Sequence, residues 1–122
     1  MNRLLRALPF VALLLSLSAC GGGGNESGQP DQLYLSTTDV TVGTPDRCYE
    51  GLGPEVHIYG GTPPYRLANS VPQGMVLNKA VVQNSGESFS ITFVNGVCMK
   101  TMPITVEDQQ GLLTHLSVTN GG

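Results

Sequence analysis

The chain has 122 residues, with 9 acidic and 6 basic side chains, a formal charge of −3 and no tryptophan. Its few cations are scattered along the sequence, whereas binding to a nucleic-acid backbone needs a clustered basic face. Nucleic acid is therefore excluded as an expected partner, and the length allows one small domain.

The first residues form a segment built like a secretory signal. Arg3 and Arg6 give it a basic start, and the apolar run over 7–17 is shorter than the roughly 20 residues that span a bilayer. Small residues then precede Cys20, which leaves an extended backbone accessible to enzymes at the membrane surface. An ordinary secretory signal or an uncleaved interfacial helix would also explain the apolar run.

The four residues Leu17, Ser18, Ala19 and Cys20 resemble the lipobox of bacterial lipoproteins. The resemblance implies that a signal peptidase recognises Leu17, Ser18 and Ala19, removes residues 1–19, and leaves Cys20 with a diacylglycerol and an amide-linked acyl chain such as palmitate. Each buried methylene contributes about 0.8 kcal/mol, so two or three chains would hold the protein on a membrane. In Gram-negative members of that family, a residue other than aspartate after the cysteine, here Gly21, implies the cell outer membrane.

A flexible tether is predicted for residues 20–31, before a folded domain over 32–120. The stretch from Gly21 to Pro30 is poor in apolar groups and rich in glycine, so it cannot form a core and is not stiff. Its mean reach is below about 20 Å.

The remaining sequence predicts strands. Apolar and polar side chains alternate strictly in 89–93 and 104–107, as in half-buried strands. The other predicted strands are 33–35, 40–42, 56–59, 65–67, 75–77, 80–82 and 112–119. Turn signals separate them at 60–64, 72–74, 84–86 and 108–111. We therefore expect an all-β sandwich or barrel of about seven to nine short antiparallel strands, with His57 and His115 facing outward.

The turn motif Gly60-Gly61-Thr62-Pro63-Pro64-Tyr65 resembles the turn between the second and third strands of bacterial immunoglobulin-like repeat domains. Val40-Thr41-Val42-Gly43 and the hairpin at 108–111 are similar to the opening and closing strands of the same domains. The resemblance implies an immunoglobulin-like β-sandwich with the Tyr65 ring at the core edge. It implies little about activity, because such domains serve as spacers, adhesive modules and docking surfaces.

The two cysteines other than Cys20 predict a disulfide. An exported chain enters an oxidising compartment, where Cys48 and Cys98 are the pair that remains. The immunoglobulin-like topology would bring both to one pole, unlike the antibody disulfide, which crosses the core. The alternative is a reactive thiol with a histidine as its base.

Three classes of function are consistent with these features. The first is an envelope lipoprotein without catalysis, whose domain contacts another protein or has a structural role. The alternative is a carbohydrate-binding or adhesive module, which would stack sugars on exposed aromatics. The aromatic side chains of the predicted domain are Tyr34, Tyr49, Tyr59, Tyr65, Phe89 and Phe93.

An enzyme or a metal-binding protein is the third class. Paired carboxylates are present at Glu107 and Asp108, but the predicted hairpin tip makes their side chains diverge into solvent. Four acidic residues could provide oxygen ligands for calcium, namely Asp39, Asp46, Glu50 and Glu55. Their spacing matches no calcium-binding loop motif, so we expect them to be ordinary surface residues. We therefore expect no metal, no cofactor and no catalytic residue.

Overall fold

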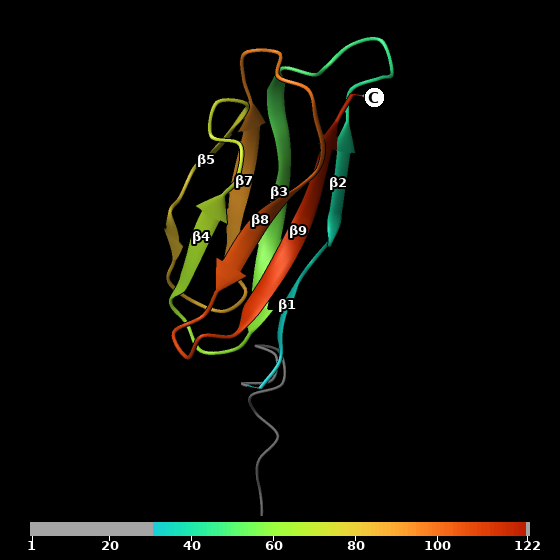
Figure 1. The fold of residues 1–122 in the computed structure, drawn as a ribbon. Helices are drawn as coiled ribbons and strands as arrows, with labels where there is room; N and C mark the ends of the chain where they lie inside the picture. The colour runs from blue at the N-terminus through green and yellow to red at the C-terminus, as the bar shows by residue number, and fades with distance from the viewer. Residues whose placement is uncertain (1–30, 122) are drawn as a thin grey trace, which may run out of the picture.

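The alternating pattern produces nine strands within residues 31–121, the part of the chain that the computed structural model describes (Figure 1). This part is all-β, and each predicted strand is confirmed. The strands are β1 (Leu33–Leu35), β2 (Asp39–Val42), β3 (Gly51–Gly60), β4 (Tyr65–Asn69), β5 (Met75–Leu77), β6 (Val81–Val82), β7 (Ser88–Phe93), β8 (Met99–Glu107) and β9 (Leu113–Asn120).

The strands form two sheets packed face to face as a β-sandwich. The first sheet has the order β1-β3-β7-β5 and the second has the order β2-β9-β8-β4-β6. Neighbouring strands are antiparallel except β2 and β9, which are parallel. This exception corrects the expectation of antiparallel strands throughout, and it arises because β2 continues the direction of β1 after crossing to the second sheet.

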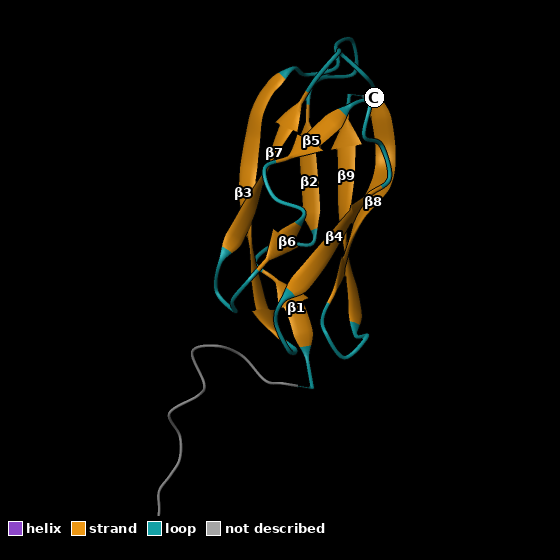
Figure 2. Cartoon of the chain, turned by 90° about the vertical axis from the view of Figure 1, so that its left-hand side faces the viewer, coloured by secondary structure: helices purple, strands orange, loops and turns teal. Residues whose placement is uncertain are grey.

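At each lateral edge of the sandwich, one chain segment pairs first with a strand of the first sheet and then with a strand of the second sheet (Figure 2). In one, β1 pairs with β3 and then β2 pairs with β9. In the other, β5 pairs with β7 and then β6 pairs with β4. The strands at the edges are therefore short, which limits uncontrolled pairing with other chains.

The core lies between the two sheets and is built by the inward side chains of the long strands. On β7 the buried residues are Phe89, Ile91 and Phe93, which alternate with Ser90 and Thr92 on the outer face. Burial of each large apolar side chain contributes about 1.5–3 kcal/mol. The inward positions predicted from the alternation are confirmed here.

Two strands begin earlier than the pattern predicted. β3 starts at Gly51 and β8 at Met99, whereas the regular alternation begins only at Val56 and Ile104. Each of these strands has a shift in its pairing register near its start, between Leu52 and Glu55 in β3 and between Met99 and Met102 in β8. A bulge inserts an extra residue and breaks the period of two, so the sequence pattern does not reveal the first part of such a strand.

Candidate functional site

The lipidation site and its recognition residues lie outside the described residues. Cys20, Leu17, Ser18 and Ala19 therefore remain predictions, as does the tether. Within residues 31–121, no helix is long and apolar enough to cross a membrane.

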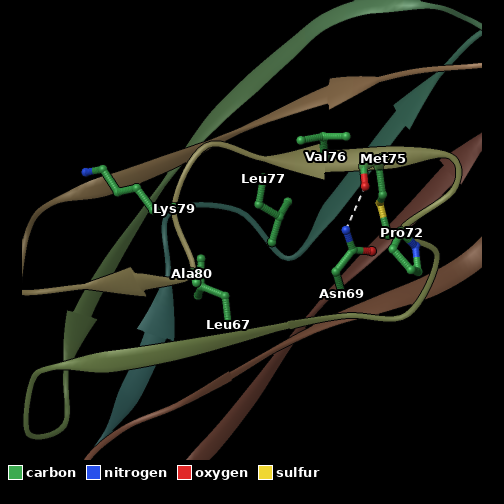
Figure 3. Close-up of a pocket in the computed structure, with 8 residues that line it drawn as sticks. All are labelled: Leu67, Asn69, Pro72, Met75, Val76, Leu77, Lys79 and Ala80. Atoms are coloured by element: carbon green, nitrogen blue, oxygen red, sulfur yellow. Dashed lines mark hydrogen bonds between the residues drawn. The ribbon is translucent and has the colours of Figure 1, made fainter.

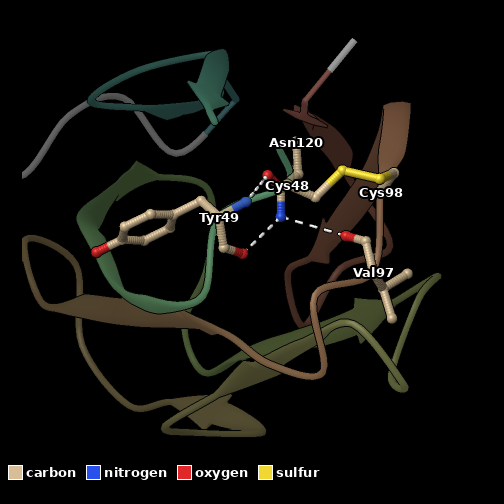
Figure 4. Close-up of a disulfide and its surroundings, with 5 residues drawn as sticks. All are labelled: Cys48, Tyr49, Val97, Cys98 and Asn120. Atoms are coloured by element: carbon tan, nitrogen blue, oxygen red, sulfur yellow. Dashed lines mark hydrogen bonds between the residues drawn. A yellow bond between two sulfur atoms is a disulfide. The ribbon is translucent and has the colours of Figure 1, made fainter. Parts of the chain in front are cut away.

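The predicted disulfide is present at one pole of the sandwich (Figure 4). Cys48, shortly before β3, is bonded to Cys98, directly before β8, with a Cα–Cα distance of 5.2 Å. The predicted pairing is thus confirmed, and the bond lies at the end of the sandwich outside the core. Because neither sulfur is a thiolate in this bond, the alternative of a reactive thiol is wrong for this form of the protein.

Asn120 lies inside the same pole and binds both segments that carry the cysteines, and it was not among the residues predicted from the sequence. Its Oδ1 accepts a hydrogen bond from Tyr49 N at 2.7 Å, and its Nδ2 donates to Tyr49 O at 2.9 Å and to Val97 O at 3.2 Å. The side chain is buried. A polar residue at the third inward position of β9, after Leu116 and Val118, was the available signal.

We expect Asn120→Ala to lower the free energy of unfolding by about 3 kcal/mol, since three partly buried hydrogen bonds to backbone groups of Tyr49 and Val97 are lost together. Urea denaturation with the disulfide intact measures the change. Asn84→Ala is the matched control, because the Asn84 side chain contacts an exposed carboxylate of Glu87, and a change within about 0.5 kcal/mol is expected there. Equal losses in the two variants would contradict the role of Asn120.

The opposite pole is built around the predicted turn motif, and Tyr65 occupies its centre. The ring is buried, and the hydroxyl donates to Gly60 O at 2.6 Å. Gly61 has a φ of 56°, in the region that favours glycine. A Cβ there would also lie 2.8 Å from Asp108 Oδ2, so the turn requires glycine at this position.

Asp108 connects this turn to the β8–β9 hairpin. Its Oδ2 accepts a hydrogen bond from Thr62 N at 2.7 Å, and its Oδ1 accepts from Gln110 N at 2.9 Å and Leu112 N at 2.8 Å. The side chain is buried, so the expectation that both Glu107 and Asp108 are solvated is wrong for Asp108. The turn motif lies too far away in sequence for its amides to be recognised as partners. Glu107 instead pairs with Arg66 at 2.8 Å on the surface.

Replacement of Tyr65 by phenylalanine is expected to lower the free energy of unfolding by about 1 kcal/mol, the net contribution of one buried hydrogen bond.

Burial raises the pKa of the Tyr65 hydroxyl, while a hydrogen bond with Ser85 lowers it and the charge of Asp108 raises it. A raised pKa in the folded state stabilises the fold below the ordinary value of 10.0, and this contribution is lost as the pH rises above that value. Urea denaturation from pH 8 to 11 should show a steeper alkaline loss for the native chain than for Tyr65→Phe, and parallel curves would contradict this.

The acids considered for calcium lie on separate elements. Asp39 begins β2, Asp46 lies in the turn between Thr44 and Arg47, and Glu50 precedes β3. Glu55 Oε1 lies 4.0 Å from His57 Nε2. In the part of the chain that the structure describes, no three His, Cys, Asp or Glu residues are grouped so that they could hold a metal ion.

The two histidines lie on different sheets and do not form a common site. His57 Nδ1 donates to Gly86 O at 2.9 Å on the outer face of the first sheet. His115 Nδ1 lies 3.0 Å from Thr105 Oγ1 on the second sheet. His57 belongs to a row of rings in which Tyr34 and Tyr59 have centroids 5.4 Å apart and His57 and Tyr59 have centroids 6.3 Å apart.

An open pocket of about 280 Å³ lies where the segment that contains β5 and β6 passes from the first sheet to the second (Figure 3). It is lined by Leu67, Asn69, Pro72, Met75, Val76, Leu77, Lys79 and Ala80. Asn69 Nδ2 donates to Met75 O at 2.7 Å and so bridges β4 and β5. The lining offers apolar contacts but no nucleophile with a base and no pair of carboxylates, so it lacks the groups that hydrolysis requires.

Comparison of the chain with protein-family models, with curated proteins and with solved structures finds no match in any of the three.

Proposed function

We propose that the protein is a bacterial envelope lipoprotein, anchored through acylated Cys20, that presents one immunoglobulin-like domain for contact with another protein and has no catalytic role. The observation that carries the proposal is the segment ending in Leu17-Ser18-Ala19-Cys20, directly followed by a glycine-rich stretch. An outer-membrane location follows from Gly21 when the cell has two membranes.

The strand order supports the immunoglobulin-like assignment. Immunoglobulin sandwiches place strands A, B, E and D on one sheet and C, F and G on the other, with C′ added in variable-type domains. In spatial order, β1-β3-β7-β5 matches A-B-E-D, and β9-β8-β4 matches G-F-C. β6 takes the place of C′ beside β4, but it follows β5 in the chain, whereas C′ precedes D in the immunoglobulin topology. β2 corresponds to a continuation of strand A that crosses to strand G.

The direction in which the chain enters the sandwich supports a presenting role. Gln32 O accepts a hydrogen bond from Gly61 N at 2.8 Å, so the described chain begins at the pole of the turn motif. The disulfide joins the segments that lead into β3 and β8, and the starts of these strands lie at the other end (Figure 1). With Cys20 in a membrane, the disulfide pole would point away from it and offer the loops over 43–50 and 94–98 to a partner.

Intact mass spectrometry of protein extracted with detergent from host membranes tests the anchor. The expected mass is that of residues 20–122 plus a diacylglycerol and an acyl chain, with two thiols that react with an alkylating reagent only after reduction. Cys20→Ser is the matched control and should appear in the soluble fraction without lipid. A lipid-free native chain with three reactive thiols would contradict the proposal.

Carbohydrate binding is a second candidate, and the row formed by Tyr34, Tyr59 and His57 favours it. These rings stand side by side on the outer face of the first sheet, and Tyr34 is exposed. Their hydroxyl and imidazole groups could bond to sugar hydroxyls beside an apolar ring face. The fraction of protein that sediments together with isolated cell-wall polysaccharide should then be lower for Tyr34→Ala than for the native chain, and unchanged for Tyr49→Ala. If the native chain itself does not sediment with the polysaccharide, this candidate function is contradicted.

A further inference from the structure

The end of the sandwich at which the described chain begins is also the end of the β8–β9 hairpin. Gln32 O accepts a hydrogen bond from Gly61 N at 2.8 Å, and Thr62 O accepts one from Gln109 N at 2.8 Å. The start of the described chain, the turn motif and the hairpin turn over 108–111 are therefore held together (Figure 1). These three segments form the entry end of the sandwich.

Large apolar or aromatic side chains are exposed on three sides of the entry end. Leu112 directly follows the hairpin turn and is 36% exposed. Leu113 is 57% exposed and is paired in register with Glu107, on the outer face of the second sheet. Tyr34 is 44% exposed and is paired with Tyr59 on the outer face of the first sheet. The entry end thus carries apolar surface at its tip and beside both sheets.

We propose that the entry end docks on a membrane surface, with Leu112 and Leu113 in the boundary between lipid headgroups and acyl chains. This docking rests on the proposed function, in which Cys20 is acylated. The predicted tether over 20–31 has a mean reach below about 20 Å, whereas the ten residues of β3 span about 33 Å. The entry end therefore stays closer to the lipid than the disulfide pole does, and the tether makes its contact with the membrane intramolecular.

The distribution of the exposed side chains selects an upright orientation of the domain. Leu113 and Tyr34 lie on opposite sheets, so a domain that lay flat would turn one of them away from the lipid. An upright domain brings both of them, together with Leu112, to the height of the headgroups. Tyrosine rings favour this height because they combine an apolar body with a polar hydroxyl. Docking thus directs the disulfide pole and its loops away from the membrane.

The charges of the entry end indicate which lipid surface it fits. Asp31 is an exposed acid beside the start of β1, and Asp108 adds a buried carboxylate. The cation Arg66 is balanced by Glu107, whose Oε1 lies 2.8 Å from the guanidinium. An anionic surface repels an end with this excess of acids, so the surface on which it docks is a zwitterionic phospholipid.

Fluorescence quenching tests the docking on the full chain, extracted from membranes of the expressing cells and inserted into phosphatidylcholine vesicles. Acylation of Cys20 and the Cys48–Cys98 bond leave no free thiol in the native chain. Gln110→Cys then supplies a single site for a fluorescent label at the exposed hairpin tip. The matched control is Gln73→Cys, an exposed turn position whose carbonyl binds the loop over 94–98 at the disulfide pole. Lipids with a nitroxide on the acyl chain should quench the label at 110 roughly threefold more strongly than the label at 73.

The intact mass of the same sample distinguishes two kinds of failure. A chain without lipid on Cys20 would overturn both the proposed function and the docking. A lipidated chain whose label is quenched equally at positions 110 and 73 would overturn the docking alone. Adding anionic phosphatidylglycerol to the vesicles should weaken the quenching at 110, and stronger quenching there would contradict the choice of a zwitterionic surface.

Two substitutions of exposed leucines test which residues make the contact. In the lipidated Gln110→Cys chain, Leu113→Asp should lower the quenching roughly threefold or more, because a charged group replaces an apolar one at the lipid boundary. Leu52→Asp is the matched control and should leave the quenching unchanged, since Leu52 is 79% exposed but lies near the start of β3 at the other end. Neither leucine is buried, so both variants should fold. Equal quenching in the two variants would contradict docking through the entry end.

Discussion

Replacing both Cys48 and Cys98 with alanine is expected to lower the free energy of unfolding by about 4 kcal/mol. The disulfide joins residues separated by 50 positions, and closure of a loop of this length removes much conformational entropy from the unfolded chain. A small domain has a total stability of about 5–15 kcal/mol, so the loss would be a large fraction of it. Urea denaturation monitored by circular dichroism measures the change, and a loss below about 1 kcal/mol would contradict it.

The same experiment becomes sharper when Asn120→Ala is added to the double alanine variant. Asn120 binds Tyr49 and Val97, which are the neighbours of the two cysteines in the chain. Without the covalent bond these segments can separate, so Asn120 should contribute less than it does in the native chain. We expect the combined loss to be smaller than the sum of the separate losses by about 1 kcal/mol. Additive losses would show that the disulfide and Asn120 act independently.

The second large effect is expected at the other pole, where Asp108→Ala should cost about 3 kcal/mol. The buried carboxylate accepts three backbone hydrogen bonds, and bonds to a charged acceptor are stronger than neutral ones. The variant leaves Thr62 N without its partner, so that the turn motif keeps the backbone bond from Gln109 N to Thr62 O but loses the carboxylate contact with the β8–β9 hairpin. Urea denaturation gives the total loss, and hydrogen exchange at the Thr62 amide shows whether the contact between the turns is the part that fails.

Two matched variants separate the causes at Asp108. Asp108→Asn keeps one acceptor oxygen and the side-chain shape, so its loss should lie between those of the native chain and Asp108→Ala. Gln109→Ala changes an exposed neighbour in the same hairpin and should stay within about 0.5 kcal/mol. If Gln109→Ala were as costly as Asp108→Ala, the effect would belong to the hairpin sequence and the carboxylate would not be its cause.

Local patterning determined most of the fold. The alternation in 89–93 and 104–107 predicted half-buried strands because a period of two assigns each side chain to a face without knowledge of the partner strand. The bulged starts of β3 and β8 could not be predicted in this way, because an extra residue in each strand interrupts the period of two. The disulfide was predictable because two cysteines remain once Cys20 is assigned to lipid, and the fold needs only to bring them together.

The sequence by itself determined the all-β class, the positions of the strands and the pairing of Cys48 with Cys98. The membrane anchor at Cys20, which it also predicts, stays a prediction. Only the tertiary structure decided which polar groups became buried, as at Asp108 and Asn120, whose partners lie far away in sequence. It also decided that the hairpin before Leu112 and Leu113 lies at the end where the described chain begins. The physical reason is that side-chain periodicity is a local property of the chain, whereas register, burial and surface neighbours depend on which distant strands pair.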